Sequence, residues 1–264
     1  MNKFFAGCLL CLSLPVLADH IPEHPAKLEW GPALALISTP DYIGSKNRVN
    51  YLVPFPYIKY RGDILRIDDG VEARLFKQPD LVLSVSGNGS LPSPEQSEER
   101  AGMDKLDASV EFGPSLEYRL LDNAASSLWL ELPLRLAVTV SKNVAAFGKV
   151  FTPRLAWRHP AVGKYDWKLR LAAGPIYADK DFLDHYYAVS TSEATLARPA
   201  YSAEAGYNGF RLDFTYSRRI GKYWLGGFIR HDSLAGSVIE DSPLVSQSQN
   251  LTAGISLAWV ISEK

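Results

Sequence analysis

A run of acidic residues in the second half of the sequence is the first place where metal chemistry could occur. Asp179, Asp181 and Asp184 fall close together, and His185 follows directly. Clusters of carboxylate oxygens can hold Ca²⁺. The run lacks the glycine and the ligand spacing of an EF-hand loop, and Lys180 lies inside it. These features favour a solvated loop, so we predict no metal and no cofactor.

Residues of the catalytic-triad types also occur, at His231-Asp232-Ser233 and at His185 with Ser190. Neighbours along a strand point to opposite faces, so the adjacent trio cannot form the hydrogen bonds of a triad. His185 and Ser190 would have to meet through the folding of their loop. The sequence also has no Gly-x-Ser-x-Gly elbow. We therefore predict that the protein is not an enzyme, and keep a membrane-bound hydrolase as an alternative.

The N-terminal residues have the three-part pattern of a secretory signal peptide. Lys3 precedes an apolar run over 4–17, and Val16-Leu17-Ala18 is a small-residue cleavage motif. Cleavage between Ala18 and Asp19 would remove both cysteines, Cys8 and Cys11, and leave residues 19–264 as one domain. The 264-residue chain has 28 basic and 29 acidic residues, a balance that argues against nucleic-acid binding.

The remaining chain has no apolar run long enough for a transmembrane helix, but it alternates with a period of two residues. Seven large aliphatic residues share one face of the stretch 127–140, among them Leu134. Glu131 and Arg135 fall on the opposite face. A strand separates these residues cleanly, whereas a helix would mix them. The pattern predicts a lipid-facing wall with a polar interior.

Similar alternation predicts further strands over 28–38, 49–60, 64–76, 81–87, 107–120, 150–157, 164–178, 210–217, 223–230 and 251–261. Tyr207-Asn208-Gly209 and Gly221-Lys222 are predicted turns, and a short helical turn is predicted around 192–197. The polar stretches 39–48, 88–106, 179–199 and 233–249 are predicted long loops. The length suits about 12 strands, within a range of about 10–14.

A soluble β-sandwich would alternate as well. It would not require aromatic residues near so many strand ends, where an outer-membrane barrel has two interfacial girdles. The residues suited to these girdles are Trp30, Tyr51, Tyr60, Trp129, Trp157, Trp167, Tyr177, Trp224 and Trp259. We therefore predict an all-β, transmembrane, antiparallel up-and-down barrel.

The charged residues of the strands fall mostly on the faces that would point into the barrel. Glu131, Arg135, Lys168 and Arg170 are the clearest lumen-facing candidates. They could line a selective pore or close the lumen as ion pairs, because charges removed from bulk water need partners. The near-equal mixture of signs favours ion pairs. The other charges in this set are Glu72, Glu111, Glu117, Arg154, Arg158, Arg211, Asp213 and Arg230.

Several short segments, none decisive alone, carry a combined signal. They include Pro40-Asp41-Tyr42-Ile43-Gly44-Ser45, Gly102-Met103, Gly113-Pro114, Arg135, Arg198-Pro199-Ala200-Tyr201 and Ser242-Pro243-Leu244-Val245. Together they resemble the MipA/OmpV family of outer-membrane proteins, in the same order and over essentially all of residues 19–264. We expect these motif residues to be structural, with Gly44 adopting a positive φ in a turn. Arg198 and Tyr201 would fold a loop back into the barrel mouth.

The resemblance implies a barrel in the outer membrane of a Gram-negative bacterium, surrounded by outer-membrane lipid. It also implies a scaffold for murein enzymes, because the family's namesake brings a lytic transglycosylase together with a penicillin-binding protein. Other members are described as porin-like. We therefore expect a non-enzymatic envelope scaffold, with a porin-like channel for small solutes as the alternative and an outer-membrane hydrolase as the third.

Overall fold

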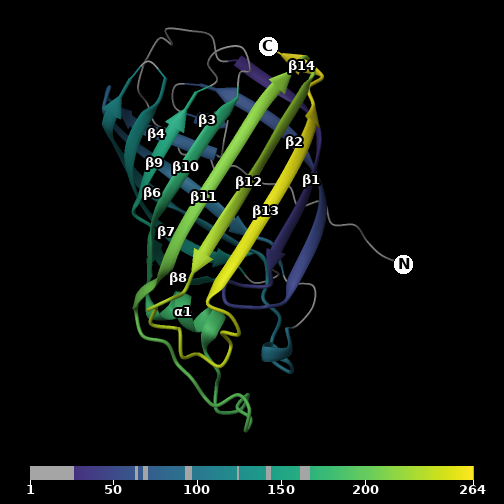
Figure 1. The fold of residues 1–264 in the computed structure, drawn as a ribbon, viewed down its shortest axis with the longest axis vertical. Helices are drawn as coiled ribbons and strands as arrows, with labels where there is room; N and C mark the ends of the chain where they lie inside the picture. Colours follow the sequence, from purple (N-terminus) through teal and green to yellow (C-terminus); the bar gives the residue numbers. More distant parts are fainter. Residues whose placement is uncertain are drawn as a thin grey trace.

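The computed structural model describes residues 27–62, 65–67, 71–92, 97–123, 125–140, 144–160 and 167–263. The predicted signal peptide and its cleavage site at Ala18 and Asp19 lie outside the described residues. One antiparallel sheet contains all of the named strands and curls around a central space (Figure 1). Within the described ranges, no helix is both long and apolar enough to cross a membrane.

The elements follow one another around this sheet. They are β1 (Lys27–Pro40), β2 (Arg48–Arg61), β3 (Leu65–Ile67), β4 (Val71–Lys77), β5 (Leu81–Ser90), the 3₁₀ helix η1 (Glu98–Arg100), β6 (Ser109–Asp122), β7 (Ser127–Thr139), β8 (Ala146–Phe151), β9 (Arg154–His159), β10 (Lys168–Ala178), α1 (Lys180–Tyr187), β11 (Gly206–Ile220), β12 (Tyr223–Ser233), β13 (Gln249–Trp259) and β14 (Ser262–Glu263).

The sheet closes on itself because β13 pairs with β1 and β10 pairs with β11. Both β8 and β9 lie between β7 and β10 as one strand interrupted at Thr152-Pro153, and β14 adds a short edge to β1. The described strands therefore occupy twelve positions around the wall. The predicted antiparallel barrel of about 12 strands is confirmed.

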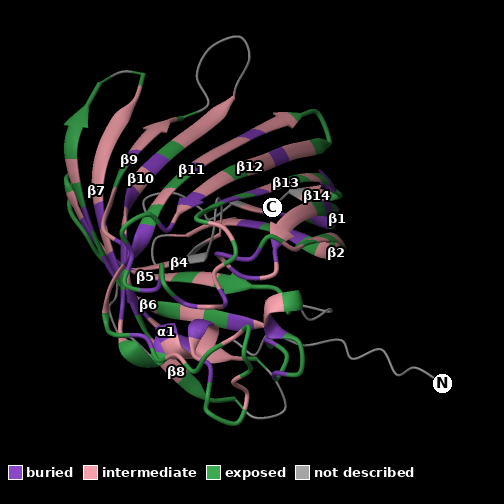
Figure 2. Ribbon diagram, turned by 60° about the horizontal axis from the view of Figure 1, so that its bottom comes forward, coloured by how far each residue is buried: buried purple, intermediate pink, exposed green. Residues whose placement is uncertain are grey.

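Alternation along the strands sorts the side chains between two surroundings, and Figure 2 shows buried and exposed residues interleaved along the wall. In β7, the Leu134 side chain points outward and is 48% exposed, whereas Glu131 and Arg135 point inward and are 2% and 6% exposed. Strand β13 repeats the pattern, with Leu251 and Leu257 outside and Asn250 and Ala258 buried inside. The outer surface is therefore an apolar band.

The two ends of the barrel differ in their connections. The connecting segments 41–47, 97–108, 179–205 and 234–248 gather at one end together with α1, which lies at the bottom of Figure 1. The tight turn at Gly221-Lys222 and the C-terminal strand β14 lie at the other end. In outer-membrane barrels, long loops are extracellular and short turns are periplasmic. We call these the loop end and the short-turn end.

The helix α1 corrects the prediction of an irregular polar loop over 179–199. The Asp179 carboxylate caps it by accepting a hydrogen bond from the Phe182 backbone N–H (2.9 Å), a strong local signal for a helix start. Phe182, Leu183 and Tyr187 are buried under it. With eight residues, the helix is too short to show a clear period in the sequence. Residues 192–197 form turns and coil rather than the predicted helical turn.

One turn prediction and one strand prediction also need correction. Tyr207-Asn208-Gly209 does not reverse the chain but lies inside β11, where Gly209 has a φ of 105° beside a shift of register against β10. Glycine allows this kink because a Cβ there would lie 2.4 Å from the Ser233 carbonyl oxygen. The predicted strand over 64–76 is a hairpin of two short strands, β3 and β4.

Aromatic residues do not all face lipid as predicted. Trp30 and Trp259 lie on the outer face, 46% and 51% exposed. Trp129 lines the lumen instead, with the Arg158 guanidinium 4.9 Å from its ring centroid. Trp224 packs inside against Tyr57, with ring centroids 5.3 Å apart. Strand alternation, which places a ring inside or outside, therefore overrides the aromatic preference for the membrane interface.

The short hairpin β3–β4 lowers the wall between β2 and β5. Strand β2 pairs with β1 along its whole length but with β3 at Tyr60 and Arg61. Within the described residues, no other strand pairs with this edge of β2. At the loop end, residues that follow β5 contact β2 and the segment before it. Tyr51 donates a hydrogen bond to the Pro92 carbonyl (2.5 Å), and Lys46 forms a salt bridge with Glu98 (2.9 Å).

Candidate functional site

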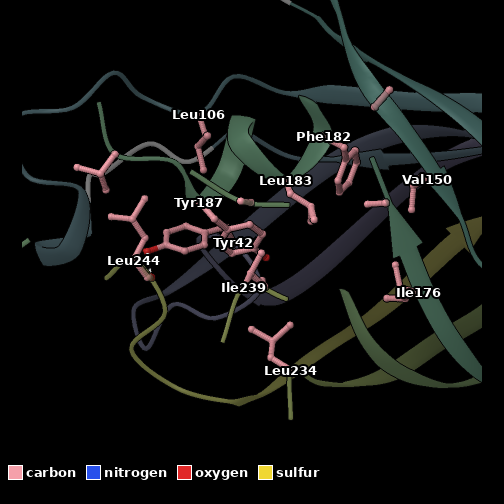
Figure 3. Packing of buried hydrophobic residues seen from close by; sticks show 14 of the residues in the cluster. Tyr42, Leu106, Val150, Ile176, Phe182, Leu183, Tyr187, Leu234, Ile239 and Leu244 are labelled. Atoms are coloured by element: carbon pink, nitrogen blue, oxygen red, sulfur yellow. Dashed lines mark hydrogen bonds between the residues drawn. The ribbon is translucent and has the colours of Figure 1, made fainter. Parts of the chain in front are cut away.

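The loop end of the barrel holds a packed apolar core. It is built from residues 41–47, 97–108, 179–205 and 234–248, which we call the loop cap. Leu183, Leu234, Ile239 and Leu244 are at most 1% exposed, and Figure 3 shows them in one cluster with Tyr42 and Tyr187, with Leu183 from α1 and the other three from the connection 234–248. The core continues onto the inner wall through Ala137, Val150, Ile176 and Ala178. The loop cap therefore packs against the inner wall of the barrel.

Two buried tyrosines connect the loops through their hydroxyl groups. Tyr42 donates to the Leu244 carbonyl (2.6 Å), and Tyr187 donates to the Ile43 carbonyl (2.8 Å). Burial raises the pKa of Tyr42 to about 12 and raises the pKa of Tyr187 well above its ordinary value. Both phenols therefore stay protonated and able to donate. Ser242 completes the connection by donating to the Tyr187 carbonyl (2.9 Å).

Most of the predicted family-motif residues meet in this cap. Gly44, at φ 102°, donates its N–H to Asn250 (2.6 Å), and the Asn250 amide donates to the Ser45 carbonyl (2.8 Å). Met103 and Leu244 are in the apolar core, and Gly102 has a φ of 80°. Pro40 ends β1, Asp41 follows it, and Pro243 precedes Leu244.

Arg198 and Tyr201 hold the longest loop against its neighbours. The Arg198 guanidinium donates to the carbonyls of Glu99 (2.8 Å), Ala101 (2.9 Å) and Glu193 (2.8 Å). Tyr201 donates to the Val238 carbonyl (2.9 Å). The remaining motif residues, Gly113, Pro114 and Arg135, lie in the barrel wall. A Cβ on Gly113 would lie 2.1 Å from the Leu134 carbonyl oxygen, so the close approach of β6 and β7 requires glycine.

The lumen below the cap holds a network of ion pairs centred on Glu131. This carboxylate accepts hydrogen bonds from Arg154 (2.6 Å), Arg158 (2.5 Å) and Arg170 (2.7 Å). Arg158 also donates to Glu117 (2.6 Å). Antiparallel pairing accounts for the arrangement, since Glu131 is opposite Arg154 and Arg158 is opposite Arg170. Three guanidinium groups thus share one buried carboxylate.

Two further pairs lie beside this network. Arg211 bonds Asp232 (2.6 Å) and Arg230 bonds Asp213 (2.7 Å). Asp232 was not predicted to face the lumen, although it lies two residues after Arg230 and so shares its face of the strand. Lys168, opposite Ser217, also lines the lumen near the short-turn end. Nothing is described of the Glu72 side chain.

A cavity of about 1000 Å³ remains between the cap and the short-turn end. Phe182, Tyr186 and Tyr187 line it at the cap. At the short-turn end it reaches Lys77, Pro79 and Pro160, which are exposed. The inner wall leaves this space because small residues face the lumen beside the arginines, namely Ser84, Ser86, Ser115, Ala172 and Gly174.

The residues considered for catalysis or metal binding are engaged elsewhere. His185 and Ser190 line one surface hollow, but Ser190 donates to Glu193 (2.5 Å) and the imidazole stacks on Phe147 with centroids 3.9 Å apart. Burial and the nearby Arg100 charge lower the pKa of His185 to about 4. Asp184 accepts a hydrogen bond from the Ala203 N–H (2.7 Å). Among the described residues, no group of three or more His, Cys, Asp or Glu side chains could hold a metal ion.

A closed antiparallel wall, apolar outside and charged inside, defines the chain as an outer-membrane β-barrel protein. The family model for the MltA-interacting protein MipA matches residues 33–261, and the chain belongs to that family. It is 23% identical over 206 residues to the outer membrane protein Omp26La of Vibrio anguillarum, covering 76% of this chain and 75% of the relative. Its location is the outer membrane of a Gram-negative bacterium.

Two solved structures are distantly similar. The outer membrane protease OmpT from Escherichia coli has a TM-score of 0.31 at 8% identity, with 89% of this chain and 96% of that chain covered. The TodX deltaS2S3 mutant monoaromatic hydrocarbon channel has a TM-score of 0.27 at 10% identity, with 89% and 66% covered. Likeness at this level is too low to inform function.

Proposed function

We propose that this protein is a non-enzymatic, closed outer-membrane barrel that holds murein-synthesising and murein-hydrolysing enzymes at the periplasmic face. The observation that carries the proposal is the apolar loop cap at one end of the barrel together with the ion pairs that cross the lumen. A wall built in this way is a rigid body in the membrane rather than an open pore.

The description of the family supports a partner of this kind, because it names an interaction with MltA. The resemblance extends the expectation to a lytic transglycosylase and a penicillin-binding protein. The contacting surface would be the short-turn end, which faces the periplasm in this class of barrel. Gly221 and Lys222 at this end are exposed, as are Gln78, Pro79 and Asp80. A small polar surface of this kind suits weak, salt-sensitive association.

An affinity experiment tests the proposal. The barrel is immobilised in detergent, and solubilised envelope proteins are passed over it at low and high salt. We expect a murein enzyme to be retained at low salt and released at high salt. Charge reversal by Lys222→Glu at the short-turn end should reduce retention, whereas Glu204→Lys on the exposed loop end is the matched control and should not. Recovery of no murein enzyme at either salt would contradict the scaffold.

The second candidate is a porin-like channel for small solutes, and the 1000 Å³ cavity is the observation in its favour. Planar-bilayer recording separates the two functions. A scaffold with an intact loop cap should show no stable ion conductance. A stable conductance, together with failure to retain a murein enzyme, would favour the channel.

We also propose that residues 1–18 are a signal peptide, so that the exported barrel domain begins at Asp19. The support is the short apolar run that ends at Ala18. Intact-mass measurement of protein from outer membranes should give an N-terminus at Asp19. Retention of Met1, or a lipid on Cys8, would contradict this processing.

A further inference from the structure

Most of the basic residues inside the barrel are arginines. The described residues that line the lumen cavity include ten basic side chains and six acidic ones. Three further carboxylates, those of Asp80, Asp122 and Asp232, pair with Arg119 and Arg211 of this lining. The charges are therefore close to balanced in total, and the capacity of the lumen for an anion depends on which guanidinium groups keep unused donors.

Arg135 is a buried arginine of this lining whose hydrogen bonds to described residues all go to neutral groups. Its guanidinium is 6% exposed and donates to two neutral hydroxyl groups, those of Ser86 (3.1 Å) and Thr152 (3.3 Å). Among the described residues its nearest carboxylate is Glu111, at 4.0 Å, beyond hydrogen-bond distance. A buried guanidinium held by neutral partners is costly unless an anion completes its surroundings.

Two more arginines approach the same place. Gly174 lies between the two arginines in the wall. On one side it pairs with Arg211. On the other side it lies against Arg154, since a Cβ added to Gly174 would be 2.7 Å from the Arg154 Cα. Thr152, which bonds Arg135, is two residues from Arg154. Arg154 and Arg211 each donate a hydrogen bond to a carboxylate through Nε. Among the described residues, no acceptor forms a hydrogen bond with the Nη groups of either side chain. Neighbouring strands therefore present three guanidinium groups with donors to spare.

We propose that the lumen is a binding site for a small organic anion bearing carboxylate or phosphate groups, with Arg135, Arg154 and Arg211 as its principal ligands. Planar guanidinium groups recognise both kinds of oxyanion through paired N–H donors. The cavity is at the upper end of the size range of small-molecule sites. Phe228 and Ile37 line other parts of the cavity and offer apolar contact to the rest of the ligand.

The cavity reaches exposed residues at the short-turn end, among them Lys77, Pro79 and Pro160, so an anion enters there from the periplasmic side. Lys77 and Lys168 line the cavity on the short-turn side and extend the positive potential towards that entrance. The site thus samples periplasmic anions, and it exists whether or not the barrel also binds a murein enzyme.

Titration calorimetry of the full barrel in a zwitterionic detergent at low salt tests the proposal. Citrate is the carboxylate probe, inorganic pyrophosphate is the phosphate probe, and spermidine is the cationic control. We expect one-to-one binding of at least one anion, no binding of spermidine, and at least tenfold weaker anion binding in 0.5 M NaCl, with added salt screening the attraction. The stronger probe identifies the oxyanion that the site prefers. Failure of both anions to bind would overturn the proposal.

Substitutions at Arg135 and Arg119 test where in the lumen the anion binds. Arg135→Gln should weaken binding at least tenfold, and Arg135→Lys, which keeps the charge but loses the paired donors, should weaken it to an intermediate degree. The matched control is Arg119→Gln. This arginine also lines the cavity, but its guanidinium is engaged with Asp80 (2.8 Å) and Asp122 (2.6 Å). We expect Arg119→Gln to bind within about twofold of the parent. Equal weakening by Arg119→Gln and by the Arg135 variants would show diffuse attraction rather than a site.

Discussion

The loop cap and the lumen are both interiors of one molecule, but they are built in opposite ways. The cap buries Leu183, Ile239 and Leu244, and the hydroxyl groups of Tyr42 and Ser242 donate to backbone carbonyls within it. The lumen buries Glu131 and Arg135 and contains a large cavity. The difference follows from their surroundings. The wall commits its apolar faces to lipid, so alternation leaves polar residues inside, whereas the cap stands in water and needs an apolar core of its own.

The two regions should therefore lose stability for different reasons. The stability of the lumen depends on charge balance, because each buried ion needs its partner. The stability of the cap depends on packing, because its core loses contacts when a side chain is shortened. Damage in the lumen should affect the whole barrel, since its charges come from the wall itself. Damage in the cap should remain at the loop end.

The largest expected effect is in the lumen. Glu131→Gln leaves Arg154, Arg158 and Arg170 without the carboxylate that they share, and we expect a loss of about 3–5 kcal/mol in the free energy of unfolding. Urea unfolding of the barrel in lipid vesicles, followed by tryptophan fluorescence, measures it. The control is Glu204→Gln, at an exposed position of the loop end. An unchanged urea midpoint for Glu131→Gln would refute the dependence on charge balance.

In the cap, Leu183→Ala should remove about 3 kcal/mol from packing, because Leu183 is fully buried. We expect protease cleavage within 179–205 and a new ion conductance, while the wall stays folded. Leu196→Ala makes the same change at an exposed leucine of the same loop and should alter neither property. A cap that stays resistant to protease in Leu183→Ala would show that its closure does not depend on this core.

The wall itself separates the two environments within one strand. Leu134→Arg places a charge in the lipid-facing band and should cost about 2–4 kcal/mol if the site lies near the membrane midplane. Arg135→Leu, one residue away, should cost mainly the hydrogen bonds to Ser86 and Thr152. Folding yield into vesicles and urea midpoints compare the pair. If Leu134→Arg folds as well as the parent, the assignment of its face is wrong.

The smallest expected effect is the pH response of the cap. Burial, with the nearby Arg100 charge and against a smaller opposite effect of Asp107, lowers the pKa of His185 from an ordinary 6.5 to about 4. The neutral imidazole is the folded form, so its contribution is complete above about pH 6.5 and is lost as the pH falls towards 4. Hydrogen-exchange protection of α1 amides should therefore decrease between pH 7 and pH 5. His185→Gln should lack this decrease, and an identical decrease in the variant would exclude His185 as the cause.

The outcome of the sequence predictions follows the same division. The wall could be predicted because strand alternation is local, and each residue in 127–140 shows its side of the wall by its position alone. The helix α1 was missed because a capped helix of eight residues, little more than two turns, has no clear period. The break at Thr152-Pro153 and the kink at Gly209 were missed because both depend on what the neighbouring strand does.

Sequence alone was enough to establish the family, through its short motif segments. It also established the barrel and the division of side chains between lipid and lumen, because these two rest on a repeat of two residues that is visible wherever it occurs. The tertiary structure decided which charges pair and which loops meet. Glu131 acquires three arginines only when β7, β9 and β10 come into register. Tyr42 reaches Leu244, about two hundred residues away, only after the barrel has closed. Such contacts depend on the path of the whole chain, so no local pattern can contain them.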